Sequence, residues 1–200
     1  MTQHKLLDAA IEAFSENGFK GTSTRDIAER AGVHHPLITY HFKNKDKLWR
    51  AAADRVFRDF RRSLASSLED HRDESPKERF ASLIRAYVHY AKSQPALHKV
   101  MVQEASYPNP RLDWLIEEHL KPFFDATFQL LEELQEMGVA PGGNPKLLFN
   151  MIRLSSGGLL ALGNELKASS DIDVSQEETL DEIAEMIINV FLPGEVRQTA

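Results

Sequence analysis

The side chains best suited to chemistry in this sequence gather between Thr22 and Lys47. Basic residues are interspersed there with hydroxyl, imidazole and phenol groups. Guanidinium, ammonium and hydroxyl groups donate hydrogen bonds to phosphate oxygens, and an arginine can also bond both acceptors on a guanine edge. Such a set is typical of a surface that binds nucleic acid.

Catalytic and metal-binding patterns are weak by comparison. The sequence has no cysteine, GxSxG elbow, P-loop or GxGxxG fingerprint. No two histidines are three or four residues apart, which excludes HExxH, HxxxH and the ExxH of di-iron bundles. The eight histidines lie at positions 4, 34, 35, 41, 71, 89, 98 and 119. We therefore expect no enzymatic activity, no cofactor and no metal, although a catalytic site assembled only in space stays open.

The region that holds these polar residues also has the pattern of two short helices joined by a tight turn. Ser23 and Asp26 have the spacing of a capping box, and Gly32 offers the left-handed residue that ends a helix. Ile38 and Phe42, four residues apart, share one face of the second helix. This layout indicates a helix-turn-helix, whose second helix enters the major groove of DNA.

Charge is distributed unevenly along the chain, although the formal net charge is −6. Residues 1–50 carry eight Lys or Arg against six Asp or Glu, whereas residues 51–200 carry 16 against 24. A small basic head on an acidic body fits a DNA-binding protein. No apolar run approaches the roughly 20 residues that span a bilayer, so we expect a cytoplasmic protein that does not enter the membrane.

Helical periodicity elsewhere predicts an all-α fold of about nine helices, with an N-terminal three-helix head on a C-terminal helical bundle. The first helix should end at Asn17, before Gly18. A long stretch over residues 110–137 should kink between His119 and Lys121 because it contains Pro122. A further helix should run over residues 145–167, and Ser175 to Glu178 form a second capping box.

From Thr24 to Leu48 the chain reads T-x-R-x-I-A-x-x-A-G-V and then I-x-Y-H-F-K-N-K-D-x-L. This pattern resembles the TetR family of bacterial transcriptional repressors. The resemblance implies a helix-turn-helix DNA-binding domain over residues 1–46 and a helical effector-binding and dimerisation domain over residues 47–200. It also implies a homodimer that binds a palindromic double-stranded DNA operator and is released by a small-molecule effector.

The resemblance also assigns roles within the head. Arg25 matches a position that can reach a base, and Thr24 matches a phosphate contact. Three residues depart from the family pattern: His34 replaces a small hydroxyl cap, Leu37 is unusually apolar, and Thr39 stands where a tyrosine is common. Leu37 or Pro36 is expected to pack against a thymine methyl group. The expected DNA-binding residues are Thr24, Arg25, His34, His35, Pro36, Leu37, Thr39, Tyr40, His41, Lys43 and Lys45.

For the body, the family implies a small-molecule pocket and a dimer interface built from the last two helices. The candidate pocket residues are Tyr87, His89, Met101, Trp114, Phe123, Phe124 and Phe128. The candidate interface residues are Leu154, Gly157, Gly158, Ala161, Ile183, Ile187 and Val190. Ordinary core packing is the alternative for both sets. Two other functions stay open: a DNA-binding regulator without an effector, and a helical enzyme or carrier whose head only resembles a DNA reader.

Overall fold

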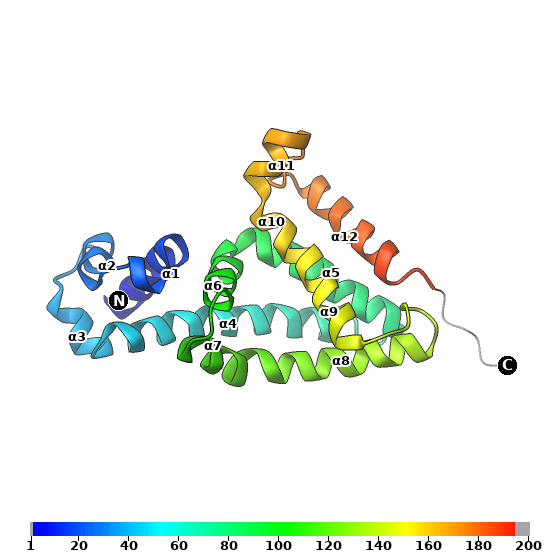
Figure 1. Cartoon of the computed structure of the whole chain (residues 1–200), viewed down its shortest axis with the longest axis horizontal. Helices are drawn as coiled ribbons and strands as arrows, with labels where there is room; N and C mark the ends of the chain where they lie inside the picture. The colour runs from blue at the N-terminus through cyan, green and yellow to red at the C-terminus, as the bar shows by residue number, and fades with distance from the viewer. Residues whose placement is uncertain (1, 195–200) are drawn as a thin grey trace. The chain divides into compact units, whose positions relative to one another are not determined.

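The structure is a computed structural model that describes residues 2–194. All regular elements in this range are helical, which confirms the all-α prediction. The chain forms two compact units, one of residues 2–59 and 96–119 and the other of residues 60–95 and 120–194. Figure 1 follows the elements along the chain by colour. No helix in the described range is long and apolar enough to cross a membrane.

The first unit holds the N-terminal helices and the start of a long fourth helix. Its elements are α1 (Thr2–Gly21), α2 (Thr24–Arg30), α3 (Pro36–Phe42), the part of α4 (Lys45–Asp70) that ends at Asp59, α6 (Pro95–Ala105), α7 (Pro110–Leu115) and the π-helical turn η1 (Ile116–Leu120). The apolar stripe of α1 is buried, with Leu6 and Ala10 fully covered. The helix leaves regular geometry at Gly18, where φ is 68°, and one more turn continues to Gly21.

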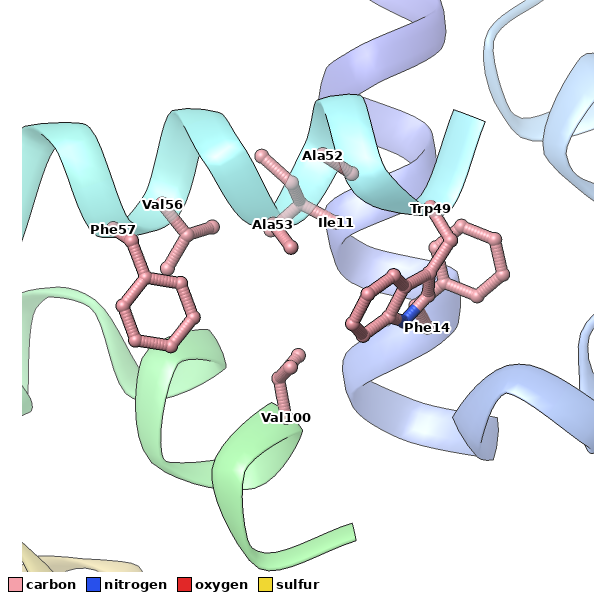
Figure 2. Close-up of a pocket in the computed structure, with 8 residues that line it drawn as sticks. All are labelled: Ile11, Phe14, Trp49, Ala52, Ala53, Val56, Phe57 and Val100. Carbon is pink, nitrogen blue, oxygen red and sulfur yellow. The ribbon is translucent and has the colours of Figure 1, made fainter. Parts of the chain in front are cut away.

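A small apolar cavity lies inside this unit, between α1, α4 and α6 (Figure 2). Its free volume is about 10 Å³, which is close to the space of one water molecule. Organic ligands need clefts of roughly 300 Å³ or more, so the cavity is a packing defect rather than an effector site. The lining residues are Ile11, Phe14, Trp49, Ala52, Ala53, Val56, Phe57 and Val100.

The second unit is built around α5 (Pro76–Ser93), which begins after the N-cap residue Ser75. The Ser75 hydroxyl accepts a hydrogen bond from the backbone N–H of Glu78 at 3.2 Å. Helix α5 contacts α8, η2 and α12. The remaining elements are α8 (Lys121–Glu136), α9 (Pro145–Arg153), the π-helical turn η2 (Leu154–Gly158), α10 (Leu159–Ala161), α11 (Gly163–Ser170) and α12 (Glu177–Phe191).

Two long helices expected from the sequence are interrupted by π-helical turns. The stretch over residues 110–137 changes geometry at η1 and resumes as α8 with Pro122 in its first turn, close to the predicted kink. The prediction of one helix over residues 145–167 is wrong, because η2 and a turn at Leu162 divide it. Gly157 and Gly158 both lie in η2. Because glycine has a low propensity for the α-helix, a departure from α-helical geometry costs less at these two residues.

The expected capping box at Ser175 is also not formed. Helix α12 begins after Gln176, which makes no side-chain cap bond. The backbone N–H of Ser175 instead donates to the Asp173 carboxylate at 2.9 Å, so this serine belongs to the preceding turn. The first turn of α12 still carries Glu177 and Glu178, whose charges favour a helix N-terminus.

Candidate nucleic-acid interface

The first helix of the motif and the turn after it have the predicted local structure. The Ser23 hydroxyl accepts from the backbone N–H of Asp26 at 3.0 Å, which caps α2. Gly32 adopts φ 63°, and the N–H of Val33 donates to the Ala28 carbonyl at 3.0 Å. This is the hydrogen bonding of a glycine-ended helix. The chain therefore leaves α2 in a fixed direction toward α3.

The second helix of the motif, α3, buries one face and exposes the other. Ile38 and Phe42 are buried in the unit core, as their spacing predicts. Pro36 opens the helix, and no side-chain cap hydrogen bond forms at its start. Tyr40 is 80% exposed, so this large side chain lies on the outer face of the helix. A helix anchored in this way can present its outer face to the major groove.

The sequence-predicted DNA-binding residues lie on α2, in the turn before α3, on α3 and just after it. The exposed ones are Arg25, His34, His35, Pro36, Thr39, Tyr40 and Lys43, and the half-buried ones are Thr24, Leu37, His41 and Lys45. Lys43 ends α3 with φ 67°, a conformation that non-glycine residues rarely adopt. Its strained backbone points to a constrained turn between α3 and α4. The contacts of these residues with DNA stay a prediction.

One hydrogen bond between the two helices of the motif was not expected from the sequence. Thr24 Oγ1 lies 2.9 Å from His35 Nε2, although the residues are eleven apart in the chain. The bond joins the first residue of α2 to the residue before α3. The bond therefore orients the Thr24 side chain, which is expected to contact phosphate, relative to His35, which is expected to read bases.

The environment of Lys45 differs from that of a freely solvated phosphate-binding lysine. Its Nζ lies 4.5 Å from the centre of the Phe19 ring. Burial lowers the pKa of Lys45, and the nearby positive charge of Arg111 lowers it further. Cation–π contacts of this kind contribute roughly 0.5–2 kcal/mol. Lys45 therefore helps hold Phe19 in place, whether or not it also reaches DNA.

Arg111 and Glu104 form a buried ion pair beside this ring, and nothing in the sequence pattern indicated it. The Arg111 Nη2 atom lies 3.0 Å from Glu104 Oε2, and the two side chains are 17% and 5% exposed. The Arg111 guanidinium lies 4.0 Å from the centre of the Phe19 ring and 5.6 Å from that of Trp49. The pair joins α6 to α7 and brings both helices against the aromatic residues Phe19 of α1 and Trp49 of α4.

The candidate effector-pocket residues are divided between the two units. Trp114 and Met101 belong to the first unit. Three phenylalanines of α8 lie in the second unit, where they surround Phe149 or contact one another: Phe123, Phe124 and Phe128. Tyr87 is also in the second unit, 5.4 Å from Phe60 between ring centres. His89 bonds to Asp181 at 2.9 Å on α12. Their role in ligand binding stays a prediction.

Five of the seven candidate interface residues line one apolar groove in the second unit. The groove has a volume of about 580 Å³ and lies between η2, α10 and α12. Leu154 and Val190 are 54% and 63% exposed on it, which is unusual for large apolar side chains. The lining residues are Leu154, Ser155, Gly158, Leu159, Leu162, Ile183, Met186, Ile187, Val190 and Phe191. Of the other two candidates, Gly157 is buried and Ala161 is exposed outside the lining.

Comparison with known proteins places these observations in a family. Residues 6–52, which contain α2, α3 and the turn between them, match the model of the bacterial regulatory proteins of the tetR family. The transcriptional regulator RutR of Escherichia coli K12 is 23% identical over 189 residues, covering 94% of this chain and 88% of RutR. The matched region is thus the one that forms the helix-turn-helix.

Solved structures share the fold over nearly the whole chain. AibR, crystallised with isovaleryl coenzyme A and operator DNA, is 16% identical with a TM-score of 0.78, covering 98% of this chain and all of AibR. FadR of Bacillus subtilis, crystallised with stearoyl-CoA, is 22% identical with a TM-score of 0.68, covering 92% and 97%. The chain therefore carries the N-terminal helix-turn-helix domain of the tetR family of bacterial regulatory proteins, followed by a helical body whose fold these solved structures share.

Proposed function

We propose that the protein is a homodimeric transcriptional repressor that binds a palindromic operator and is released by a small-molecule effector. The observation that carries the proposal is α3, a short helix with one face anchored by Ile38 and Phe42 and the other exposed. Such a helix, presented twice by a two-fold dimer, reads two half-sites about one helical turn of DNA apart. Enzymatic activity is not part of the proposed function.

The base-reading set consists of Arg25 and the exposed side of α3. Arg25 is exposed on α2 and pairs with no carboxylate among the residues the structure describes. Its guanidinium is therefore free to bond O6 and N7 of a guanine. Leu37 is half-buried and apolar, and it supplies a contact for a thymine methyl group. Tyr40 and Lys43 hold the phosphate backbone on either side.

Dimerisation is supported by the apolar groove between η2, α10 and α12. Its exposed apolar side chains are costly in water, and burying them against a second copy would remove that cost. Small residues such as Gly158 allow helices to approach closely there. A two-fold interface buries the same patch of both subunits, which matches the symmetry of a palindrome.

Effector release is supported by the complexes of two fold neighbours with coenzyme A thioesters. Helix α4 contributes residues to both units of the chain, so it is the segment through which we expect a ligand in the body to affect the head. A ligand shifts this equilibrium only by its differential affinity for the two states. Occupancy would favour a state whose two recognition helices no longer fit successive major grooves.

The proposal is tested by selecting bound duplexes from a random pool with the full-length wild type and with Leu37→Ala. We expect the wild type to enrich a palindrome and Leu37→Ala to lose its preference at one thymine in each half-site. Enrichment of no sequence would contradict the proposal, and an unchanged preference in Leu37→Ala would contradict the assigned role of that residue. Small molecules that raise the melting temperature of the protein are then tested for operator release at fixed salt. If none of them releases the operator, the result favours a regulator without an effector.

A further inference from the structure

The second unit contains an arginine whose charge is not paired. Arg153, the last residue of α9, is half-buried, and no carboxylate among residues 2–194 lies within ion-pair distance of it. Its Nε and Nη2 atoms donate to Asn150 Oδ1 at 3.3 and 3.0 Å, and the Tyr87 hydroxyl takes a further hydrogen bond. Both partners are neutral. The guanidinium has five N–H donors, so donors remain for a negatively charged group.

The same arginine borders a group of phenylalanines that are only partly covered. We call the aromatic cluster the four residues Phe123, Phe124, Phe128 and Phe149. Phe149 is buried at its centre, whereas the three from α8 are half-buried. The Arg153 guanidinium lies 5.9 Å from the centre of the Phe124 ring. A second cation borders the cluster, since Lys146 Nζ lies 5.6 Å from the centre of the Phe128 ring. An apolar surface with a few convergent polar groups is the usual composition of a ligand site, and the cations suit an organic anion.

The local backbone places these groups together. Helix α9 gives way to the π-helical turn η2 directly after Arg153, and η2 packs against α5, which carries Tyr87. Single π-helical turns are frequent at functional sites because they change the direction of side chains on a helix. Burial raises the pKa of Tyr87 to about 12, and the Arg153 charge opposes that rise. The phenol therefore stays a neutral hydrogen-bonding group at neutral pH.

We propose that Arg153 and Tyr87 bind the anionic head group of an effector whose apolar body packs on the aromatic cluster. The head group is a carboxylate or a phosphate, since a planar guanidinium binds either through two parallel hydrogen bonds. This inference rests on the proposed effector function and specifies its ligand as an amphipathic anion. Binding supplies the missing negative charge to Arg153, and it covers ring surface that water otherwise contacts.

The test titrates the full-length protein with matched ligands by calorimetry, each below its aggregation concentration. The probes are octanoate and decanoate as carboxylates, octyl and decyl phosphate as phosphates, and octanol and decanol as neutral counterparts. We expect at least one anion to bind about tenfold or more tightly than its alcohol. The preference between carboxylate and phosphate identifies the head group. Binding of no anion, or equal binding of anions and alcohols, would overturn the inference.

Variants separate the charge from the packing. Arg153→Met should abolish the preference for anions and leave alcohol binding unchanged, because methionine keeps an apolar stem but no charge. Arg153→Lys should restore part of the preference, since it keeps the charge without the planar fork. The control is Arg85→Met. In the wild type the Arg85 guanidinium bonds Glu185 at 2.6 Å, so removing it should leave the preference for anions over alcohols unchanged. An anion preference that survives in a folded Arg153→Met protein contradicts the proposal.

Operator release is measured in the same samples, so that this inference and the proposed function can fail separately. An anion that binds through Arg153 without releasing the operator supports the site and contradicts effector control of DNA binding. A neutral alcohol that releases the operator while no anion binds supports effector control and overturns the anionic site.

Discussion

The buried pair of Glu104 and Arg111 makes a quantitative prediction about the stability of the first unit. Glu104 Oε2 accepts from Arg111 Nη2 at 3.0 Å, and both its carboxylate oxygens lie 3.1 Å from Arg111 Nε. Replacing Glu104 with glutamine keeps the shape but leaves the guanidinium, only 17% exposed, without a counter-charge. Removing one partner of a buried pair costs about 3–5 kcal/mol. We expect Glu104→Gln to cost about 3 kcal/mol, because Arg111 keeps some access to water.

The double variant Glu104→Gln/Arg111→Met should recover most of this loss. A buried ion pair can be replaced by uncharged groups of similar volume with little net change, because the desolvation cost of both charges disappears. Part of the loss should remain, since Arg111 also packs on the rings of Phe19 and Trp49. The double variant should therefore be more stable than Glu104→Gln alone.

Urea unfolding followed by tryptophan fluorescence measures the effect directly. Both tryptophans, Trp49 and Trp114, lie in the first unit, with ring centres 6.0 Å apart, so the signal reports on this unit. The free energy of unfolding follows from the midpoint and slope of the transition. A loss below about 1 kcal/mol in Glu104→Gln, or a double variant less stable than the single one, would refute the argument from charge burial.

Three further predictions concern the interface, the turn and the body. Val190→Glu places a charge in the apolar groove and should convert the dimer into a monomer, as measured by light scattering. Val102→Glu, at a similarly exposed valine of the first unit, should leave the dimer intact. A dimer that persists in Val190→Glu contradicts the proposed interface. Gly32→Ala should lower the free energy of unfolding in urea by about 1 kcal/mol, because φ at Gly32 is 63°. Gly142→Ala, with open space and no positive φ, should leave it unchanged. Equal effects of the two substitutions would contradict the argument that the left-handed backbone at the turn requires glycine. Burial raises the pKa of Tyr87 from 10.0 to about 12, so the folded state holds the phenolic proton more tightly. The contribution of this phenol to the free energy of unfolding should therefore be full below pH 10 and lost as the pH rises to about 12. An absorbance titration in which Tyr87→Phe removes no late-ionising tyrosine would contradict the prediction.

The head could be predicted from the sequence because its signals are local. A cap at Ser23, a left-handed glycine at Gly32 and the four-residue spacing of Ile38 and Phe42 each depend on a few neighbouring residues. These local preferences agree with one another and with the packing, so they determine the helices without knowledge of distant contacts.

The polar contacts that position the head were not predictable. The bond between Thr24 and His35 depends on the angle between two helices, and the pair of Glu104 and Arg111 forms across a Pro-Asn-Pro turn. Neither has a sequence pattern of its own. The π-helical turns were only partly predictable. Pro122 indicates a break near η1, whereas Gly157 and Gly158 appear in the sequence only as interface candidates and give no sign of the change of helix type at η2.

The candidate ligand residues were chosen by type, and type alone does not determine position. Aromatic side chains at helical spacing occur in any core, so Trp114 was grouped with Phe124 although they lie in different units. Arg153 was not singled out, because a charged residue near the end of a helix is ordinary in sequence. Only its lack of a carboxylate partner among the described residues, with Phe124 and Tyr87 beside it, distinguishes it.

The central claim is sequence-specific DNA binding through Arg25 and α3, and a salt titration of operator affinity tests it most directly. Fluorescence anisotropy is measured on a palindrome from the gene's own promoter and on a scrambled duplex, between about 50 and 200 mM salt. We expect affinity for the palindrome to fall steeply with salt. Arg25→Ala should lose about 1–3 kcal/mol and its preference for the palindrome, whereas Lys43→Ala should weaken both duplexes and reduce the salt slope by about one. Arg72→Ala, an exposed arginine in the second unit, should behave as the wild type. Equal affinity for both duplexes in the wild type, or binding that does not depend on salt, would contradict the account.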